Sequence, residues 1–400
     1  MNLIFLTMSR MEDISRRGIY TDLMRKFRDE GHSVYIVTPY ERSFGQSTGL
    51  KEEDGIYILG VKTLNLQKTN VIEKGLGQVL VEGQYKRAIK HYLSNVQFDL
   101  ILYSTPPITF PKVIDYLRKR NPQAISYLLL KDIFPQNAVD LGLMSTSGVK
   151  GLLYKFFRNK ERKLYALSDF IGCMSPANVD YILKYNKDID SSHVEVAPNS
   201  ITLVDLPLLK KEDVCKRYNL PIDRPIFIYG GNLGKPQGIP FLIDCLDANS
   251  NRVDCHFLII GTGTELNHLQ RWYDNKKPHS VTVMDGLPKK EYDELVSVCD
   301  VGMIFLDYHF TIPNYPSRLL PYLENKMPVI CATDPNTDIG PIAEQNGYGY
   351  WCESNSVDAF NMMLDKMIHS DRLLMGQKGY DYLCKNYQIS TTYETIVKHV

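Results

Sequence analysis

The stretch from Tyr229 to Gly238, YGGNLGKPQG, follows the apolar run PIFI and precedes IPFLIDCL, which has the apolar pattern of a helix. A strand, a glycine-rich turn and a helix in this order form the start of a parallel α/β unit. In such a unit, the amides of the turn and of the helix N-terminus point toward an anion, and Lys235 adds a mobile cation. We therefore predict that this turn binds a nucleotide diphosphate.

Two further clusters follow in the second half of the chain. The turn Gly261-Thr262-Gly263 comes after the next apolar run, where glycines can be simple turn residues. The cluster NYPSR, at 314–318, precedes the helical segment LLPYLENK. Ser317 can cap that helix, or it can bind a phosphate together with Arg318, whose guanidinium suits bidentate contacts. None of these spacings is G-x-G-x-x-G or G-x-x-x-x-G-K-[ST], so neither a dehydrogenase nor an ATPase is favoured.

Two series of short apolar runs divide the chain of 400 residues. The runs alternate with amphipathic helical segments, which is typical of parallel sheets with helices on both faces. A polar, proline-containing segment at 200–222 separates them, and we interpret it as a linker. We predict an α/β fold with two Rossmann-like domains, at 1–203 and 204–385, that face a central cleft. The predicted strands are NLIFLT, SVYIVT, IYILGV, LILYST, AISYLLL, DFIGCM and VEVAP, then PIFIYGG, CHFLIIGTG, SVTVMDG, VGMIFLD, PVICATD and GYGYW.

Composition argues against several classes of protein. Basic and acidic residues number 46 each, and the absence of net charge argues against a nucleic-acid partner. The eight cysteines include no C-x-x-C pair, so reduced core thiols are favoured over disulfides or zinc, and we expect no metal. The start, MNLIFLT, lacks a basic region and predicts a strand instead of a signal peptide, and no apolar segment is long enough to span a membrane. We expect a cytoplasmic protein.

Four stretches resemble the family 4 retaining glycosyltransferases of the GT-B fold, and within them the fucosamine-transferase-like group that builds bacterial capsule, exopolysaccharide and O-antigen units. The segment MGQKGYDYLCKNYQ resembles the closing helices of that family, which implies that a helix at about 386–400 packs back on the first domain. The resemblance covers nearly the whole chain and implies metal-independent hexosyl transfer from a nucleotide-sugar donor, without another cofactor. The stretches are LLLKDIFPQNAVDLGLM, YGGNLGKPQGIPFLI, FLIIGTGTELNHL with VTVMDGLPKKEYDELVSVCDVGMIFL, and YPSRLLPYLENKMPVICA.

The resemblance also implies a donor site in the second domain. In this family the glycine-rich loop and basic residues bind the donor diphosphate, and backbone after a strand holds the base. The implied diphosphate residues are Gly231, Asn232, Gly234, Lys235, Gln237, Ser317 and Arg318, and the implied base residues are Met284, Gly286 and Leu287.

This sequence departs from the family pattern in that domain. Asn232 and Gln237 replace an arginine and a lysine of many relatives, which leaves Lys235 and Arg318 as the cations. Two glutamates that usually contact the sugar and the ribose are replaced by Pro313 and Pro321, and Glu324 is too displaced to be assumed a substitute.

The first half offers candidates at the ends of its strands. Lys131 and Asp132 follow SYLLL, and charges that end a buried strand indicate a ligand site, since desolvation is unfavourable without a partner. They resemble the R-D-x-x-P motif of the polysaccharide group, which implies catalytic residues; a structural ion pair between them is the alternative. Arg17 and Gly18 resemble the family's acceptor-side glycine loop, although a solvated basic loop explains them equally. Ser104 can also line the acceptor pocket.

The segment at 149–167, VKGLLYKFFRNKERKLYAL, mixes apolar and basic residues. Such a helix can rest on an anionic membrane surface, at the inner face of the cell membrane, or pack on the core with a solvated basic side. With the resemblance, it favours a polyprenyl-diphosphate-linked glycan acceptor in bacterial surface polysaccharide synthesis. Two alternatives remain: a non-catalytic GT-B subunit that supports a partner transferase, and a GT-B-type nucleotide-sugar epimerase.

Overall fold

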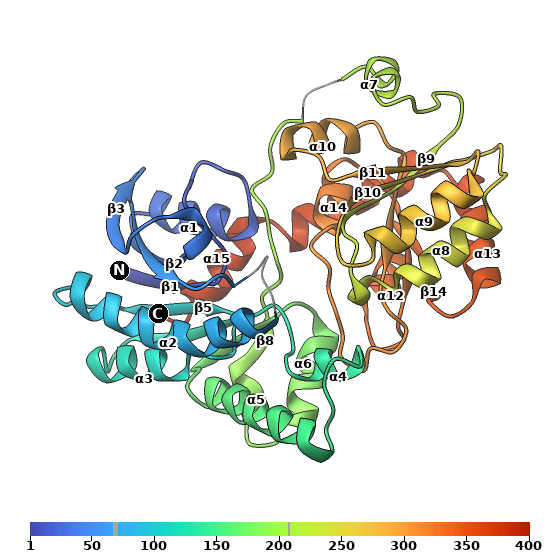
Figure 1. Cartoon of the computed structure of the whole chain (residues 1–400). Coiled ribbons are helices and arrows are strands. Elements are labelled where there is room, and N and C mark those ends of the chain that lie inside the picture. The colour runs from blue at the N-terminus through green and yellow to red at the C-terminus, as the bar shows by residue number, and fades with distance from the viewer. Residues whose placement is uncertain (67–70, 207–208) are drawn as a thin grey trace. The chain divides into compact units, whose positions relative to one another are not determined.

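The chain forms two compact units, shown in a computed structural model that describes residues 1–66, 71–206 and 209–400 (Figure 1). The first unit consists of Met1–Thr202 and Gln388–Val400, and the second consists of Leu203–Tyr387. In the described residues, no helix has both the length and the apolar character needed to cross a membrane.

The strands of the first unit form one sheet. They are β1 (Asn2–Leu6), β2 (Ser33–Glu41), β3 (Gly49–Glu53), β4 (Ile56–Thr63), β5 (Leu100–Ser104), β6 (Ile125–Leu130), β7 (Phe170–Cys173) and β8 (Val194–Val196). Their order is β3-β4-β2-β1-β5-β6-β7-β8, and β3 alone is antiparallel to its neighbour in this described sheet. The apolar runs predicted as strands are confirmed. Edge strand β3, GLKEE, was not predicted because its partly exposed, polar residues lack an apolar run.

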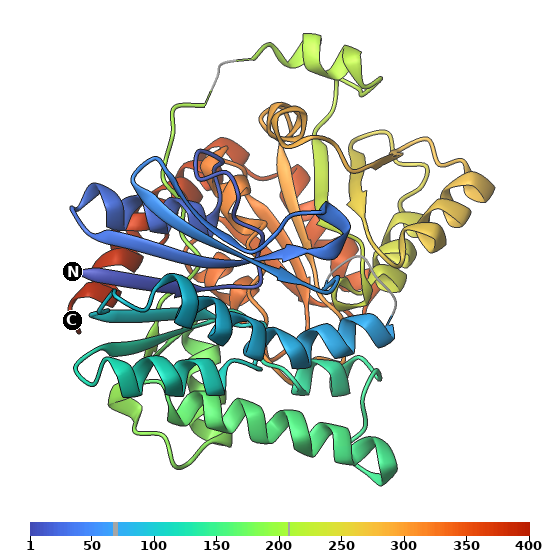
Figure 2. The ribbon, with the colours of Figure 1, turned by 60° about the vertical axis from the view of Figure 1, so that its left-hand side comes forward.

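Helices cover both faces of this sheet (Figure 2). On one face, α1 and α15 pack on buried residues of β1, β2 and β4, and α2, α3 and α5 run along the other face. The helices are α1 (Ile19–Asp29), α2 (Val71–Tyr92), α3 (Pro111–Arg120), α4 (Gln136–Asp140), α5 (Gly148–Ala166), α6 (Pro176–Tyr185) and α15 (Ile389–Val397), with the 3-10 turns η1 (Arg42–Phe44) and η2 (Ser191–His193).

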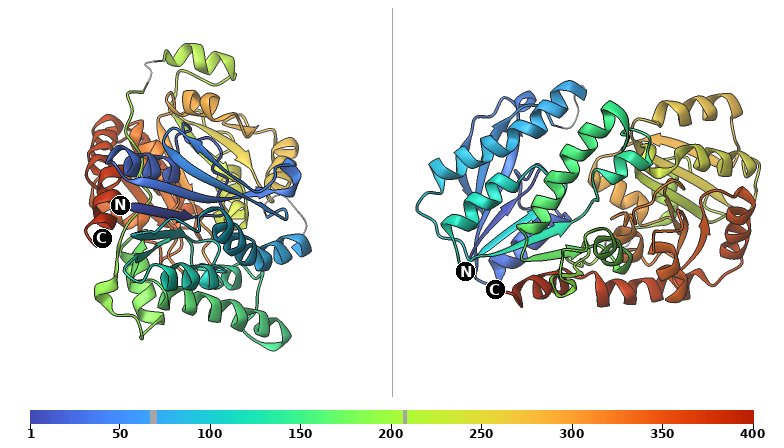
Figure 3. Two further views of the ribbon diagram at one scale, coloured as in Figure 1. Left: turned by 90° about the vertical axis from the view of Figure 1, so that its left-hand side faces the viewer. Right: turned by 90° about the horizontal axis from the view of Figure 1, so that it is seen from below.

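The end of the chain returns to the first unit through α15. The ring of Tyr393 lies 4.9 Å from that of Phe27, and its hydroxyl is 2.8 Å from His32 Nε2. Lys398 forms an ion pair with Glu195 at the other end of the helix. As a result, the two termini lie side by side in both views of Figure 3.

The second unit has a doubly wound parallel sheet with the order β11-β10-β9-β12-β13-β14 in its described part. Its strands, all predicted, are β9 (Ile226–Asn232), β10 (His256–Thr262), β11 (Val281–Asp285), β12 (Val301–Phe305), β13 (Val329–Thr333) and β14 (Gly349–Glu353). Its helices are α7 (Lys211–Arg217), α8 (Ile239–Ala248), α9 (Leu266–Lys276), α10 (Lys289–Val296), α11 (Leu319–Glu324), α12 (Ile339–Gln345), α13 (Val357–Ile368) and α14 (Arg372–Asn386). Residues of α8, α9 and α13 form one core with the sheet.

The segment interpreted as a linker contains one helix, α7. Val214 and Cys215 of this helix are buried. Lys211 Nζ lies 2.7 Å from Asp300 Oδ2, and Arg217 pairs with Glu294 at 2.8 Å. These ion pairs attach α7 to the second unit, although its sequence is mostly charged.

Candidate functional site

Three neighbouring strands of the second unit end together at one edge of the sheet. Gly231 of β9 lies opposite Gly261 of β10, which lies opposite Asp285 of β11. The predicted diphosphate loop therefore shares an edge with the predicted base segment, Met284 to Leu287. Met284 and Leu287 are half-buried, whereas Gly286 is exposed. Ligands of doubly wound sheets bind beyond this edge, where the strand order reverses between β9 and β12.

The glycines of this edge allow two chain segments to approach closely. A Cβ atom on Gly261 would lie 1.8 Å from the carbonyl oxygen of Gly231. Gly231 itself has a φ of 117°, in the region that favours glycine. The amide of Leu233 then donates to Thr262 O at 2.9 Å. The glycine at 261 thus serves the packing of the two loops.

Arg318, between β12 and α11, reaches the glycine-rich loop. Its guanidinium lies 4.3 Å from the ring centre of Tyr229. A Cβ atom on Gly231 would be 3.9 Å from Arg318 Nη2. Arg318 Nη1 is buried without a hydrogen-bond partner among the described residues. Burying a charged donor unpaired is unfavourable, so this geometry is suited to an anion that supplies the missing acceptor.

Three tyrosines support the loop and the arginine, and sequence reasoning missed all of them. Tyr322 Oη accepts a hydrogen bond from the Gly230 amide at 3.1 Å, and Tyr229 Oη donates to Asn232 O at 2.8 Å. Tyr292 lies so close that a Cβ atom on Gly230 would be 1.9 Å from its hydroxyl. They come from β9, α10 and α11, so only the folded chain brings them together.

Within the loop, the two residues that replace basic ones bind each other. Asn232 Nδ2 donates to Gln237 Oε1 at 2.9 Å across the 3-10 turn η3 (Lys235–Gln237). Gly234, directly before this turn, is buried. Lys235 is exposed and forms no ion pair within the described chain. The amide pair closes the turn and leaves Lys235 as its exposed cation.

The segment before α11 lacks the two glutamates that the resemblance implies. Ser317 is exposed, and α11 has Arg318 at its N-cap position with no side-chain hydrogen bond, which argues against the alternative that Ser317 caps this helix. Pro313 is buried, and the Pro321 carbonyl accepts from the Asn325 amide at 3.2 Å inside the helix. Glu324 is buried at the last position of α11.

Asp334 fixes this segment and was also missed. It follows β13, is fully buried, and accepts the hydroxyl of Thr337 at 2.9 Å. Thr337 Oγ1 in turn accepts the Asn314 amide at 2.9 Å. Burial raises the pKa of Asp334 to about 6. The only sequence signal is an acidic residue directly after an apolar strand, the same signal that singled out Asp132.

In the first unit, Lys131 and Asp132 directly follow β6, as predicted, but they do not pair with each other. Lys131 Nζ donates to Ala197 O at 3.0 Å. Asn137 Nδ2 donates to both oxygens of Asp132, at 2.8 and 2.9 Å. Desolvation lowers the pKa of Lys131 to about 7 and raises the pKa of Asp132 to about 6. This arrangement argues against a structural ion pair between the two.

The predicted acceptor-side residues lie at the ends of β1 and β5, where the strand order of the first sheet reverses. Ser104 is buried, and its hydroxyl is 3.4 Å from Thr7 Oγ1. Arg17 is half-buried, and its Nη2 donates to Thr202 O at 2.6 Å, whereas the neighbouring Arg16 is exposed.

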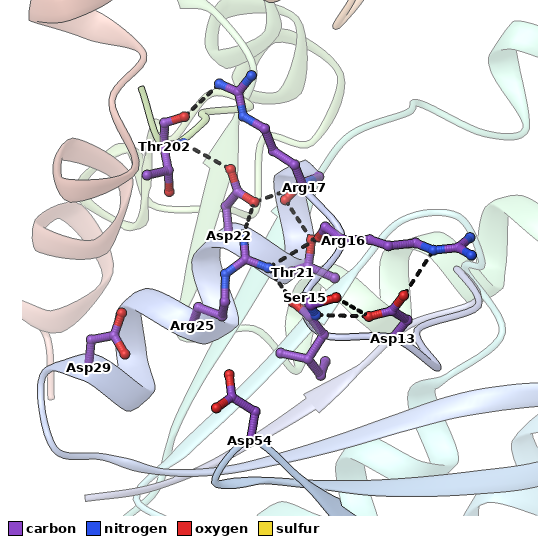
Figure 4. A network of polar contacts seen from close by, with 12 residues as sticks. Asp13, Ser15, Arg16, Arg17, Thr21, Asp22, Arg25, Asp29, Asp54 and Thr202 are labelled. Atoms are coloured by element: carbon purple, nitrogen blue, oxygen red, sulfur yellow. Dashed lines mark hydrogen bonds and ion pairs between the residues drawn. The ribbon is translucent and has the colours of Figure 1, made fainter. Parts of the chain in front are cut away.

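Asp22, which sequence reasoning missed, organises this loop (Figure 4). Its side chain is buried and pairs with Arg25 at 2.6 Å. It also accepts the amides of Gly18, at 3.0 Å, and Thr202, at 2.9 Å. Asp22 therefore joins the start of α1 to the end of the first unit's main segment.

The loop also lines a pocket of about 460 Å³. Arg10, Arg16 and Arg17 line it, together with Glu12 and Asp13. Arg10 pairs with Glu12, and Arg16 pairs with Asp13 at 3.0 Å. In the described residues, no group of three or more metal-binding side chains is found here or elsewhere.

Helix α5 combines both features considered for the segment at 149–167. Phe157 is buried, and Arg158 is tied to Glu161 of the same helix. In contrast, Leu152, Leu153 and Phe156 are 67%, 51% and 45% exposed. Lys155, Arg162 and Lys163 are exposed as well. One side of α5 thus packs on the unit, while another presents apolar and basic groups.

Comparison with known proteins agrees with this geometry. Residues 210–382 match the family of glycosyl transferases group 1. The probable glycosyltransferase WbjE of Pseudomonas aeruginosa is 20% identical over 325 residues, which cover 80% of this chain and 78% of that protein. Sucrose-phosphate synthase from Thermosynechococcus elongatus has a TM-score of 0.78 at 13% identity, covering 100% of this chain and 98% of that one.

A structure of Anabaena HepE in complex with UDP has a TM-score of 0.68 at 13% identity, covering 100% of this chain and 99% of that one. The likeness to these structures extends over both units and establishes the fold. The chain has the GT-B glycosyltransferase fold, and its residues 210–382 are similar to the group 1 glycosyl transferases.

Proposed function

We propose that this protein transfers a hexose, with retention of configuration and without a metal, from a nucleotide diphosphate donor to a glycan acceptor. The observation that carries the proposal is Arg318, whose buried Nη1 has no partner in the described chain beside the glycine-rich loop. A diphosphate would supply the acceptor atoms that this guanidinium lacks. The relative HepE, whose structure contains UDP, supports a donor of this class.

The site would act by stabilising charge. As the bond between sugar and diphosphate breaks, negative charge grows on the leaving diphosphate, and Arg318, Lys235 and loop amides are placed to stabilise it. On the first unit, Asp132 would act on the acceptor. Asn137 Oδ1 is buried without a partner in the described structure and would accept a hydrogen bond from an acceptor hydroxyl.

The acceptor that we propose is a polyprenyl-diphosphate-linked glycan of a bacterial surface polysaccharide, reached at the inner face of the cell membrane. The exposed Leu152, Leu153 and Phe156 of α5, next to exposed basic residues, support a contact with anionic lipid. The likeness to WbjE agrees with a role in glycan synthesis.

The first test is a calorimetric titration of the purified chain with UDP, GDP, dTDP and ADP, without added metal. The proposal predicts that one nucleotide binds clearly more tightly than the others. Binding of none would contradict it.

A non-catalytic subunit that supports a partner transferase is the second candidate, because Pro313 and Pro321 stand where the resemblance implies glutamates. Donor hydrolysis or sugar transfer by the purified chain alone would exclude it. An epimerase would instead convert the free nucleotide sugar without an acceptor, which product analysis detects.

A further inference from the structure

A second pocket of the first unit, of about 450 Å³, shares no lining residue with the pocket around Arg16 and Arg17. It lies between the end of β4 and the second half of α2, with a residue of η1 also in its lining. It contains none of the residues assigned above to the donor or to the acceptor.

The lining of this pocket is basic. Arg42, Lys62, Arg87 and His91 line it, and none of its described lining residues is acidic. Lys62 and Arg87 are exposed and form no ion pair with any residue that the structure describes. The pocket at Arg16 differs, because acidic residues there pair with the arginines. Two cations without an acidic partner in the described structure, Lys62 of β4 and Arg87 of α2, indicate an anionic ligand.

Two buried polar atoms of the same pocket lack partners. Thr63 is 2% exposed, and its Oγ1 has no hydrogen-bond partner in the described chain. Gln84 Oε1 is likewise buried and unpaired. Buried polar atoms are nearly always hydrogen-bonded, so each indicates a missing group. A hydroxyl group suits both, because it can donate to the Gln84 oxygen and either donate to or accept from the threonine.

We propose that this pocket binds an acidic sugar, one that carries a phosphate or a carboxylate group. The basic side chains hold the anionic group, and Thr63 and Gln84 bind sugar hydroxyls. A volume of about 450 Å³ lies within the range of small-molecule sites. The proposal is independent of the transfer reaction, because it requires neither a nucleotide nor Asp132.

The test is a calorimetric titration of the full chain with glucose 6-phosphate, glucuronate, glucose and inorganic phosphate. We expect at least one of the two acidic sugars to bind and glucose not to bind measurably. The acidic sugar that binds more tightly shows whether the pocket prefers a phosphate or a carboxylate group. Arg87→Ala should weaken that binding about tenfold, the usual effect of losing a charge-assisted hydrogen bond. Lys90→Ala, on the exposed side of the same helix and outside the pocket lining, is the matched control and should change nothing.

Thr63→Val separates sugar binding from simple anion binding. This variant should weaken binding of the acidic sugar several-fold and leave binding of inorganic phosphate unchanged, because the basic side chains hold the phosphate and only the sugar has alcohol hydroxyls that reach Thr63. The proposal would be overturned if neither acidic sugar bound, if glucose bound equally well, if Arg87→Ala kept the wild-type affinity, or if Thr63→Val left the sugar affinity unchanged. Binding to phosphatidylglycerol vesicles through Arg87 without binding of either acidic sugar would also overturn it.

Discussion

The loops after β1 and after β9 lie where the strand order of their sheets reverses. The arginines at these two loops differ in their hydrogen-bond partners. Arg17, after β1, donates to the carbonyl of Thr202, and the neighbouring Arg16 pairs with Asp13. Arg318 reaches the loop after β9, but its Nη1 is buried with no partner in the described structure. In the first loop, Arg17 Nη2 and the Arg16 guanidinium bind oxygens of the same unit, whereas beside the second loop Arg318 Nη1 is left available.

This difference distinguishes polar groups that stabilise the fold from polar groups that are available to bind a ligand. A guanidinium bound to the chain's own carbonyl stabilises the fold and has less capacity for a ligand. A guanidinium held by an aromatic ring, as Arg318 is by Tyr229, keeps its donors available at some cost in stability. The predictions below test which polar groups belong to each class.

The largest effect is expected at Asp132, which lacks an oppositely charged partner in the described chain. Asp132→Asn should lower the rate of sugar transfer about 100-fold or more, as expected for the loss of an acid–base group. Nucleotide affinity should stay at the wild-type value, because the donor loop is unchanged. Transfer assays and calorimetry on the same preparation check both statements, and wild-type turnover would remove Asp132 from the mechanism.

The pH dependence of stability gives an independent readout for the same variant. Burial raises the pKa of Asp132 to about 6, above the value of about 3.9 in unfolded chains. Its contribution to stability is therefore present below about pH 4 and is lost as the pH rises through about 6. Asp132→Asn should raise the Tm at pH 8 and not at pH 4. A lower Tm at pH 8 would assign the residue a structural role.

Arg17→Ala should act mainly on stability. Loss of its bond to Thr202 O should lower the free energy of unfolding by about 1.5 kcal/mol, within the range for hydrogen bonds to charged groups. Nucleotide affinity should not change. Denaturant unfolding and calorimetry measure the two quantities, and a variant of normal stability with weakened nucleotide binding would break the contrast between the loops.

The hydroxyl of Thr63, in the first unit, is another polar group without a partner in the described chain, and it is therefore available to a ligand. Thr63→Val should raise the free energy of unfolding by about 1 kcal/mol without ligand, because a buried hydroxyl without a partner is unfavourable. For a unit of this size, the Tm should rise by about 3 °C. Scanning calorimetry measures it, with Thr395→Val as a control whose hydroxyl already binds Thr391 O at 2.8 Å. If Thr63→Val lowered the Tm as much as Thr395→Val does, the Thr63 hydroxyl would have a hydrogen-bond partner in the unliganded protein.

Lys235→Ala should have the smallest effect. Its exposed ammonium is screened by solvent, so nucleotide affinity should fall about threefold, within the range for exposed charge pairs. The loss should shrink at high salt. Lys277→Ala, another exposed lysine of this unit, outside the loop, is the control. If Lys235→Ala weakened nucleotide binding as much as Arg318→Ala does, Lys235 would contribute as much to diphosphate binding as Arg318.

The sequence predicted what depends on local pattern. Apolar runs located the strands, and charged or glycine residues at strand ends located Asp132, Lys235 and the glycine-rich loop. It did not predict β3, whose polar edge residues need no apolar run. Nor did it predict the pairing of Asn232 with Gln237.

Other groups were missed because their partners are distant in the sequence. Asp22 bonds to Thr202, and Tyr322 bonds to Gly230, across 180 and 92 positions respectively. No periodicity in one sequence indicates such pairs, since they arise when separate elements are packed together. The residues at the strand ends could therefore be predicted from the sequence, whereas the contacts that support them are visible only in the structure.

The central claim is that Arg318 is kept available for a diphosphate. The direct measurement is calorimetric titration of wild-type chain and Arg318→Ala with whichever of UDP, GDP, dTDP and ADP binds best, without metal. The variant should bind at least about tenfold more weakly, the loss expected for a charge-assisted bond, with an unchanged Tm or a higher one. Equal affinity in a folded variant would contradict the account and would place Arg318 with the structural arginines.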